Sequence, residues 1–269
     1  MIERFSQFPA SLAERSRRIS LDGIPALLAH PDGSTPAPWV LWLHGRTASK
    51  ELDPGRYLRW LRAGVAAVAV DLPYHGERAD PAMQAPERSL DTFEAMMLDM
   101  PGVLASLREE HRGLLDPSRA GIGGMSLGGM IALRALCEPH PFKAAVVEAT
   151  TGWLEGQYFP QEFGLGSAPW PVHHPRERVR RLDAMSRVPA WRPIPLLAVH
   201  ASGDRVVSWA GQSAFLDALR RRYVESGVDA GLVESLVFEE TGAPEEHVGF
   251  GRFANDAKNA QAEFLARVL

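Results

Sequence analysis

Short apolar runs alternate with amphipathic stretches along most of the chain, which is typical of a mostly parallel β-sheet covered by helices on both faces. Asp22-Gly23 separates the first two runs, and this dipeptide favours a tight hairpin, so we expect the first two strands to pair antiparallel. The run at 65–72 is apolar on both faces, as in a central strand. Eight strands are predicted, at 18–21, 24–30, 38–44, 65–72, 120–124, 143–149, 195–200 and 232–238.

Apolar residues recur at helical spacing between and after these runs. This spacing predicts helices at 57–63, 90–111, 127–137, 209–223 and 250–269. Pro101 lies inside the second of them. We expect it to kink or split that helix, because a proline ring clashes with the preceding turn and donates no hydrogen bond.

The stretch 152–193 interrupts this alternation. It contains six prolines and a single short helical pattern, near 177–186. Its aromatic side chains include Trp153, Tyr158, Phe159, Trp170 and Trp191. Long insertions of this kind often form lids or binding loops, and exposed aromatic residues without such a role would promote association. We therefore expect one α/β domain over 1–269 that carries a lid-like insertion at 152–193.

Composition narrows the function classes by exclusion. The 269 residues carry 29 Lys and Arg against 33 Asp and Glu, a net charge of −4, which leaves no basic footprint for nucleic acid. The single cysteine, Cys137, excludes an internal disulfide and any site with several cysteine ligands. The first 18 residues lack the apolar core of a signal peptide, and no window approaches about 18 consecutive apolar residues. We expect a soluble, cytoplasmic protein that binds neither nucleic acid nor membrane, with its oligomeric state left open.

The segment Gly124-Met125-Ser126-Leu127-Gly128 matches the pattern G-x-S-x-G between a predicted strand and a predicted helix. Such a turn strains the backbone of the serine, admits only glycine two residues to either side, and exposes the hydroxyl at the carboxyl edge of the sheet. The positive end of the following helix would face a developing oxyanion. A glycine-rich phosphate loop is the alternative, but the lysine of a P-loop is missing. The motif therefore indicates a nucleophilic serine.

A serine hydroxyl needs a base that takes up its proton, and the base needs an acid that orients it. After Ser126, the segment HASGDRVV contains Asp204 and the segment GAPEEHVGF contains His247. Each follows a predicted strand, so both belong to the sheet edge where the serine lies. His200 is a rival base, but its position inside an apolar strand favours a packed core histidine. His75 precedes the serine in the chain, an order that disfavours it.

The insertion contains an adjacent histidine pair, His173 and His174, which raises the question of a metal site. Adjacent side chains do not face the same way, and no carboxylate lies at the usual ligand interval. We predict histidines of the surface or the lid here. Neither a metal nor an organic cofactor is expected.

Three stretches, LDPSRAGIGGMSLGG, WLHGRTASKE and DLPYHGER, resemble those of α/β-hydrolases, and the resemblance extends over residues 18–269. They are most similar to the dienelactone hydrolase and prolyl-oligopeptidase-like branch of small esterases. This resemblance implies Ser126 as nucleophile, His247 as base and Asp204 as acid. Glu148 is the alternative acid, since some family members place the acid at the end of the preceding strand. The chain differs from dienelactone hydrolases in having serine rather than cysteine at the turn, and its 269 residues include no counterpart of the prolyl oligopeptidase β-propeller.

Acyl transfer also needs two backbone N–H groups directed at the carbonyl oxygen as it becomes negative. Leu127, the residue after the nucleophile, is expected to supply one of them. By similarity to the HG-type loops of the family, His44-Gly45-Arg46 is expected to supply the other, from Arg46. A simple glycine turn after the strand is the alternative.

The side chain of Arg46 is a candidate for substrate contact, as are Trp153 and Trp170 of the insertion. We hypothesise that Arg46 selects a carboxylate or a polar acyl group, because a guanidinium pairs readily with a carboxylate. It could instead pair with an acidic residue of the chain: Glu51, Asp71 or Glu77. Asp71 itself is expected to tie loops together through hydrogen bonds.

These residues together predict a serine hydrolase that cleaves small carboxylic esters through an acyl-enzyme. A small-molecule ester is the expected substrate. A peptidase or amidase of the prolyl-oligopeptidase-like type is one alternative. A binding protein that keeps the fold without turnover is the other, since fold alone does not establish function.

Overall fold

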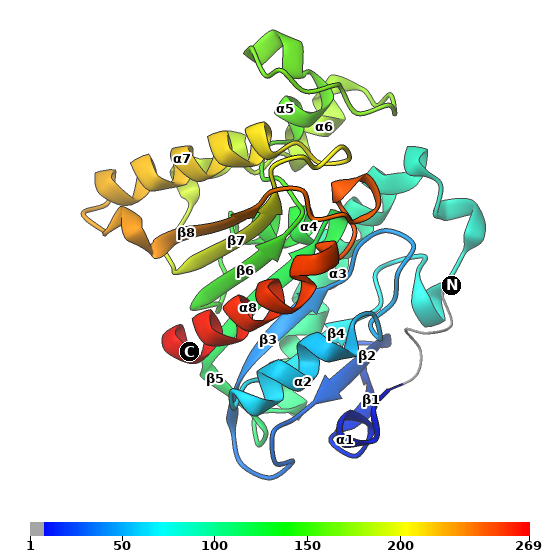
Figure 1. Cartoon of the computed structure of the whole chain (residues 1–269). Coiled ribbons are helices and arrows are strands. Elements are labelled where there is room, and N and C mark those ends of the chain that lie inside the picture. The colour runs from blue at the N-terminus through cyan, green and yellow to red at the C-terminus, as the bar shows by residue number, and fades with distance from the viewer. Residues whose placement is uncertain (1–7) are drawn as a thin grey trace.

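An eight-stranded sheet runs through the middle of the molecule (Figure 1). The computed structural model describes residues 8–269. The prediction that the first 18 residues are not a signal peptide therefore falls partly on residues 1–7, which lie outside the described residues. The strands are β1 (Ser16–Leu21), β2 (Ile24–Ala29), β3 (Ala37–Leu43), β4 (Ala66–Val70), β5 (Leu115–Met125), β6 (Ala144–Glu148), β7 (Leu196–Ala201) and β8 (Val233–Phe238). Their order across the sheet is β1-β2-β4-β3-β5-β6-β7-β8, which confirms the predicted α/β fold class.

Both antiparallel pairings lie at one end of the sheet. β1 pairs with β2 through Asp22-Gly23, whose φ angles of 51° and 79° are both positive, as a type I′ hairpin turn requires. β2 also runs antiparallel to β4, and the remaining neighbours pair in parallel. β5 begins at Leu115, five residues earlier than predicted, because a polar segment continues along β3 past an irregularity between Ala37 and Trp39.

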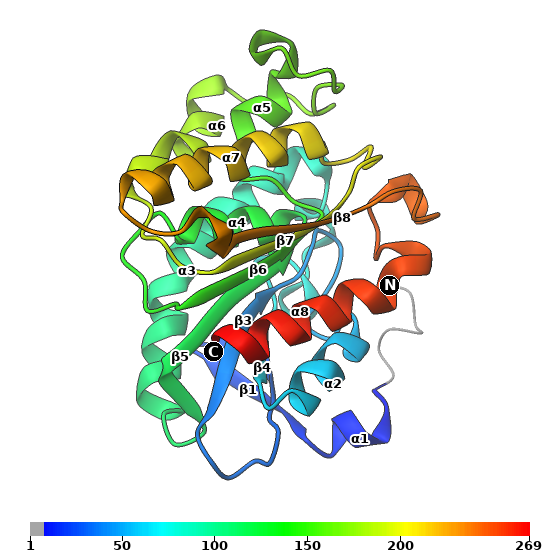
Figure 2. The same cartoon turned by 60° about the vertical axis from the view of Figure 1, so that its left-hand side comes forward.

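Alternate side chains of the sheet enter two separate hydrophobic layers. On β3, Trp39, Leu41 and Leu43 enter one layer, whereas Val40 and Trp42 enter the other, which follows from the two-residue period of a strand. The first layer is covered by α3 (Ser89–Glu110), α4 (Leu127–Ala135) and α7 (Trp209–Glu225). The second is covered by α1 (Ala10–Ala13), α2 (Pro54–Arg62) and α8 (Ala254–Val268), with α2 and α8 side by side (Figure 2).

Two helices differ from their predictions. α3 is continuous over 22 residues, so the expectation that Pro101 splits it is wrong; Pro101 is exposed, and water can satisfy the carbonyl group that it leaves without a donor. The last helix starts later than predicted, because Phe250 has a φ of 59° and a 3₁₀ turn (Gly251–Phe253) precedes α8. Within residues 8–269, none of the helices combines the length and the apolarity that a bilayer crossing demands.

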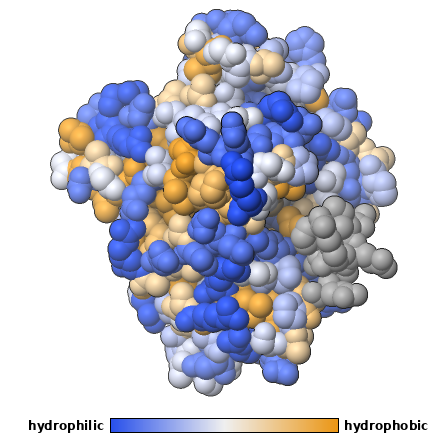
Figure 3. All heavy atoms as spheres, viewed as in Figure 1, coloured by the Kyte–Doolittle hydropathy of each residue, from blue (hydrophilic) through white to orange (hydrophobic). Residues whose placement is uncertain are grey.

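β8 forms the far edge of the sheet, and its apolar side chains contribute to a patch between α7 and α8 (Figure 3). Leu236 and Phe238 are half-buried there. The ring of Phe238 stacks on Phe253, with centroids 4.8 Å apart. This contact closes the base of the loop that leads from β8 to α8.

The insertion at 152–193, which we call the roof, is more helical than predicted. Where the sequence indicated one helical piece, it contains α5 (Leu154–Tyr158), α6 (Arg176–Leu182) and 3₁₀ turns at Pro160–Phe163 and Met185–Ala190. The short α5 covers little more than one turn, too few residues for a periodic pattern to be visible in the sequence. The roof lies beyond the carboxyl ends of the strands (Figure 1).

Ion pairs connect the roof to α3. Arg178 of α6 pairs with Asp91 and, at 2.7 Å, with Glu94, while Arg181 pairs with Glu94 at 2.6 Å. The pKa values of both carboxyl groups lie below their ordinary values; hydrogen bonds and charge from the arginines lower them against the opposing effect of burial. The roof is thus held to the first helix layer rather than suspended over it.

Candidate active site

The turn that carries Ser126 joins β5 to α4 with a strained backbone. Ser126 has φ 49° and ψ −121°, a conformation that costs a non-glycine residue free energy and persists only where packing enforces it. A Cβ at Gly124 would lie 2.5 Å from the carbonyl carbon of Gly128, and one at Gly128 would lie 2.2 Å from the carbonyl oxygen of Leu43. The expectation that only glycine fits at these two positions is therefore confirmed.

A third glycine of the turn was not singled out from the sequence. A Cβ at Gly129 would lie 2.7 Å from three side-chain atoms of Thr150. The Thr150 hydroxyl donates to the carbonyl oxygen of Ser126 at 2.7 Å. Gly129 thus lets the chain after β6 approach closely enough for Thr150 to hold the turn.

The structure brings Ser126, His247 and Asp204 together. His247 Nε2 lies 3.0 Å from Ser126 Oγ, and His247 Nδ1 lies 2.7 Å from Asp204 Oδ2. The two hydrogen bonds connect residues that are 121 and 43 positions apart in sequence. His247 and Asp204 are both buried, so water competes little for these bonds.

The loop after β7 fixes the carboxylate of Asp204. Its Oδ1 accepts the backbone N–H groups of Val206 and Val207, both at 2.8 Å, which leaves Oδ2 for the imidazole. The following loop is joined to this one, since the N–H of Arg205 donates to the carbonyl oxygen of Glu245 at 3.0 Å.

The carboxylate next to His247, that of Glu246, stabilises the loop that carries this histidine. Glu246 accepts the backbone N–H groups of Thr241 (2.6 Å) and Gly242 (2.8 Å). Hydrogen bonds from Thr241 hold the pKa of the Glu246 carboxyl below its usual value. Glu245 and Glu246 both have positive φ, so this loop has a tight, irregular path that a periodic sequence pattern does not reveal.

Glu148, the alternative acid, is engaged elsewhere. It is buried at the end of β6, where Arg56 donates to both of its carboxylate oxygens at 2.6 and 2.9 Å and Gln261 donates at 2.7 Å. A buried carboxylate with these partners ties α2 and α8 to the sheet. Its position leaves Asp204 as the carboxylate on the imidazole of His247.

The rival histidines have structural partners. His200 Nε2 donates to the carbonyl oxygen of Val207 at 2.9 Å, and burial lowers its pKa, as expected of a packed core histidine. His75 Nδ1 donates to the carbonyl oxygen of Pro73 at 2.7 Å, and burial lowers the pKa of this ring too. Both rings are thereby favoured in the neutral form inside the fold.

The histidine pair of the roof divides into an exposed and a buried member. His173 is exposed, but His174 is buried, where it accepts from the Tyr158 hydroxyl at 2.9 Å and donates to the carbonyl oxygen of Glu87 at 3.0 Å. His174 therefore connects α5 to the segment before α3. Residues 8–269 contain no group of three or more His, Cys, Asp or Glu side chains arranged to hold a metal ion.

The loop after β3 lies directly against the serine. A Cβ at Gly45 would be 3.5 Å from Ser126 Cβ and 3.4 Å from Met125 Cγ. Among the described residues, neither the N–H of Arg46 nor that of Leu127 donates a hydrogen bond to the protein. Both N–H groups therefore remain candidates for an oxyanion hole, which needs donors that are free to bind the ligand.

His44 holds this loop in place as a neutral imidazole. Its Nδ1 donates to the carbonyl oxygen of Gly45 at 2.7 Å, and its Nε2 accepts the N–H of Leu72 at 3.1 Å. Burial lowers the pKa of His44 to about 4, so Nε2 keeps the lone pair that accepts this bond at neutral pH.

A buried lysine holds the same loop from its other end. Lys50 Nζ lies 2.7 Å from Asp71, 2.6 Å from Glu77 and 3.0 Å from Glu51. Asp71 also accepts the backbone N–H groups of Lys50 and Glu77, both at 2.9 Å, which confirms that it ties loops together. A Cβ at Gly76 would lie 2.0 Å from Asp71 Oδ1, so this carboxylate requires glycine there.

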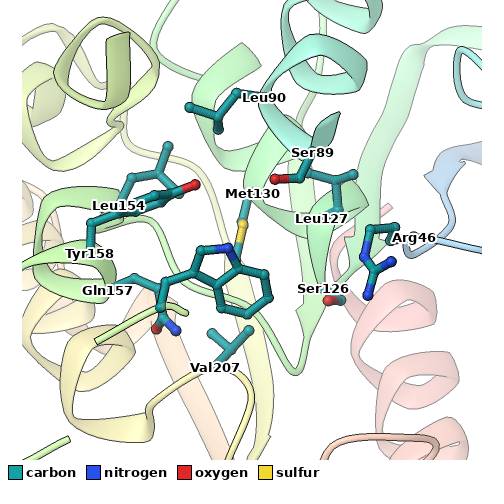
Figure 4. A pocket seen from close by; sticks show the side chains of 11 residues that line it. Arg46, Ser89, Leu90, Ser126, Leu127, Met130, Leu154, Gln157, Tyr158 and Val207 are labelled. Carbon is teal, nitrogen blue, oxygen red and sulfur yellow. The ribbon is translucent and has the colours of Figure 1, made fainter. Parts of the chain in front are cut away.

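Two hollows meet at Ser126. The smaller one, which we call the closed pocket (Figure 4), lies between α4, the start of α3 and the roof and has a cavity volume of about 40 Å³. The larger one, which we call the open groove, has a cavity volume of about 600 Å³ and extends over the loops after β3 and β4 as far as His247. Besides Ser126, both hollows include Arg46 and Trp170 in their walls. The rest of the closed pocket is formed by Ser89, Leu90, Leu127, Met130, Leu154, Gln157, Tyr158 and Val207.

Two polar side chains fix the roof wall of the closed pocket. Asp183 accepts the N–H of Leu154 at 2.6 Å, at the start of α5, and burial raises its pKa to about 7. Gln157 of α5 donates to the carbonyl oxygen of Val206 at 2.8 Å and accepts the N–H of Ser208 at 3.2 Å. The two hydrogen bonds of Gln157 join the roof to the loop that carries Asp204.

The three candidate contact residues have different positions. Arg46 and Trp170 line both hollows. Trp153 lines neither of them; its ring packs on Phe163, with centroids 4.8 Å apart, and covers Gly156. Neither hollow therefore supports the expectation of a substrate contact at Trp153.

Several pocket residues were missed in the sequence. Met130 had a usable signal: it follows Ser126 by four residues on α4, and residues with this spacing share a helix face. Leu90, Gln157 and Tyr158 had none, since they reach the pocket only through the packing of α3 and the roof on the core.

Comparison with known proteins gives a family match. The sequence profile of the prolyl oligopeptidase family matches residues 90–269. "Putative esterase YitV" of Bacillus subtilis (strain 168) is 28% identical over 221 residues, which cover 77% of this chain and 84% of that protein. "Esterase YjfP" of Escherichia coli (strain K12) is 33% identical over 146 residues, 52% of this chain and 54% of that protein.

Solved structures share the fold. The crystal structure of TT1662 from Thermus thermophilus superposes with a TM-score of 0.71 at 24% identity, covering 93% of this chain and 98% of that one. A puromycin-hydrolysing peptidase of Mycobacterium tuberculosis gives a TM-score of 0.68 at 18% identity, covering 94% of this chain and 39% of that one. At these identities the likeness concerns the fold alone.

A serine on a strained turn between a parallel strand and a helix, in this sheet order, defines the class of α/β-hydrolase serine hydrolases. Since the family profile spans about two thirds of the sequence, the chain belongs to the prolyl oligopeptidase family.

Proposed function

We propose that this chain hydrolyses small carboxylic esters with Ser126 as nucleophile, His247 as base and Asp204 as the acid that orients it. The observation that carries the proposal is the run of two hydrogen bonds, 3.0 Å from Ser126 Oγ to His247 Nε2 and 2.7 Å from His247 Nδ1 to Asp204 Oδ2. The esterase names of two relatives support the substrate class.

The reaction proceeds in two half-reactions. Ser126 Oγ attacks the ester carbonyl carbon while its proton passes to His247 Nε2; the tetrahedral intermediate then expels the alcohol, which leaves with that proton. Water enters, gives a proton to His247 and attacks the acyl carbon, and collapse returns the proton to Ser126 Oγ and releases the carboxylic acid. The net change is ester plus water to acid plus alcohol. Asp204 stays ionised and stabilises the imidazolium that forms.

The N–H groups of Arg46 and Leu127 bind the oxyanion in both half-reactions. Two observations support this role: the residues Arg46 and Leu127 lie beside Ser126, and neither N–H group has an acceptor within the described residues. Donors that are already oriented need no reorganisation when the charge develops, which is why they lower the barrier.

The two hollows suggest how an ester lies in the site. The alcohol leaves with a proton from His247, and His247 lines the open groove, so the leaving group occupies the groove. The acyl chain then occupies the closed pocket, with Trp170 in contact at the boundary. In this proposal the chain works as one domain in which the roof shapes the acyl pocket.

The test is the Ser126→Ala variant. We expect kcat on p-nitrophenyl esters to fall by roughly 10⁴-fold or more, because the residual rate comes from binding and the oxyanion donors alone. A fluorophosphonate probe should label the wild-type protein at Ser126 and leave the variant unlabelled. Replacement of an exposed serine of β8, Ser235→Ala, is the matched control and should change neither rate nor labelling. Turnover or labelling of Ser126→Ala near the wild-type level would contradict the proposal, and an unlabelled wild type would favour a binding protein.

Cleavage of amides is the second candidate, and membership in the prolyl oligopeptidase family favours it. An amide needs firmer protonation of its leaving amine by His247 than an ester does. Matched aminoacyl p-nitroanilides and p-nitrophenyl esters distinguish the two: a kcat/KM for the anilide within about tenfold of that for the ester would make this chain a peptidase or amidase.

A further inference from the structure

The guanidinium of Arg46 lies beside Ser126 at the boundary of the two hollows (Figure 4). Its Nη1 donates one hydrogen bond, to the carbonyl oxygen of Gln84 at 3.0 Å. A guanidinium carries five N–H donors in a planar fork that matches a carboxylate. The remaining donors are available to a ligand next to the nucleophile.

The acidic residues that the sequence offered as partners for Arg46 are engaged with another cation. Glu51, Asp71 and Glu77 each lie within 3.0 Å of Lys50 Nζ. Within residues 8–269, no carboxylate oxygen lies within 4.0 Å of the Arg46 guanidinium. Arg46 is half-buried, so part of its hydration is lost without a compensating anion from the protein.

The charges around the two hollows differ, and this difference indicates where an anion would bind. Arg46 is the one charged side chain in the wall of the closed pocket. In the groove wall it is accompanied by Glu51, Glu77 and Arg18; because Lys50 and Arg18 pair with these two carboxylates, the groove adds no uncompensated positive charge to that of Arg46. A negative group is therefore favoured on the acyl side of the scissile bond.

We propose that the substrates are esters whose acyl part carries a carboxylate, that is, monoesters of short dicarboxylic acids, with the free carboxylate bound by Arg46. This inference rests on the proposed function and specifies its substrate class. Because the guanidinium belongs to the same residue as the proposed oxyanion donor, its reach limits the carboxylate to a few bonds from the carbonyl carbon. The acid product is then a dicarboxylate.

The experiment compares monoethyl succinate with diethyl succinate, which share the acyl chain and the leaving alcohol but differ in charge, by release of ethanol. We expect the wild type to prefer the monoester in kcat/KM and Arg46→Met to lower the ratio of monoester to diester at least about tenfold, a difference of about 1.4 kcal/mol. Arg46→Lys should restore part of the ratio, since it keeps the charge but not the planar fork. Arg62→Ala, which removes an exposed arginine of α2 that lines neither hollow, is the matched control and should leave the ratio unchanged.

Two further measurements complete the test: the effect of salt, and an ester that carries its carboxylate on the alcohol part and not on the acyl part. Raising NaCl to about 0.5 M should reduce the preference for the monoester, because it screens a partly exposed charge pair. The inference would be overturned if Arg46→Met lowered kcat/KM equally on both succinate esters. It would also be overturned if Arg46→Met lowered kcat/KM more on 4-acetoxybutyrate, an ester whose carboxylate lies on the alcohol side. Fluorophosphonate labelling of Ser126 distinguishes failure of the substrate class from failure of the proposed function. An enzyme that is labelled but does not prefer the monoester refutes only the substrate class. An enzyme that is not labelled refutes the proposed function as well.

Discussion

The two sides of Ser126 are built from different kinds of structure. On one side the closed pocket has walls from α4, α3 and the roof, and these walls are mostly apolar. On the other side the open groove is formed by loops after β3 and β4 and by the loop of His247, and it includes charged residues. We therefore expect the pocket to select the acyl part by its shape and by the charge of Arg46, and the groove to accept leaving groups of different sizes. A chemistry that needs a defined acyl group but tolerates varied leaving groups fits this division.

The two sides also differ in how they are held. The roof is connected to α3 by Arg178 and to the loop of Asp204 by Gln157, and within the roof Asp183 accepts the N–H of Leu154 at the start of α5. The groove loops are held by one buried cluster around Lys50. Since the acid loop touches the roof, the shape of the acyl pocket and the orientation of His247 share a support. Changes on the pocket side should thus affect both selectivity and rate.

Among changes to the walls of the two hollows, the largest effect is expected from filling the closed pocket. Met130→Trp should reduce kcat/KM for p-nitrophenyl hexanoate by about 100-fold, roughly 2.7 kcal/mol, while the acetate ester loses less than about threefold. Val248→Trp, at an exposed position on the rim of the groove, is the matched control and should leave the ratio of hexanoate to acetate unchanged. If both variants shift this ratio equally, the two hollows do not divide acyl and leaving groups.

A smaller effect concerns the pH dependence of the roof anchor. Burial raises the pKa of Asp183 to about 7 in the folded protein, from an ordinary value of 3.8. The folded state then binds more protons than the unfolded state between these pH values, so the contribution of Asp183 to stability is largest at acidic pH and declines as pH rises toward 7. We expect the difference in unfolding free energy between the wild type and Asp183→Asn to fall by roughly 2 kcal/mol between pH 4.5 and 7 in urea titrations.

Asparagine keeps one acceptor for the N–H of Leu154 but does not titrate, so the difference between the two proteins isolates this carboxyl group. A difference that grows with pH would mean that the ionised form is the one that the fold stabilises.

The smallest of the three effects concerns the joint between the roof and the acid loop. Gln157→Leu removes both hydrogen bonds of this side chain to the loop 206–208, and we expect kcat to fall about tenfold on acetate and hexanoate esters alike, because Asp204 and His247 lose part of their fixed orientation. Gln161→Leu, an exposed position of the roof, serves as the control. A change in chain-length preference without a change in kcat would instead show that Gln157 shapes the pocket and does not support the acid.

Much of the fold could be predicted from local patterns. Asp22-Gly23 indicated the hairpin because few dipeptides accept two positive φ angles in succession. The glycines around Ser126 indicated the strained turn because the neighbouring backbone leaves no space for a Cβ. Pro101 and the roof were less predictable, since a proline is tolerated in a helix where its exposed side is hydrated and since α5 is too short for a pattern.

The candidate site was predictable as a set of residue types and chain positions, but its arrangement was not. Glu148 and Asp204 both follow buried strands, and the choice between them depended on Arg56, which lies 92 positions before Glu148 and occupies its carboxylate. No feature near either acidic residue indicates that contact.

The sequence by itself determined which elements form, that a serine stands on a strained turn, and that an acid and a histidine follow it at strand ends. These properties depend on backbone sterics and hydrophobic periods that act over a few residues. Only the tertiary structure decided that Lys50 pairs with the carboxylates near Arg46, that Trp170 lines both hollows while Trp153 lines neither, and that α4, α3 and the roof together form the walls of the closed pocket. The reason is that charge pairing and cavity shape depend on distances between residues far apart in the chain, and those distances exist only after the layers have packed.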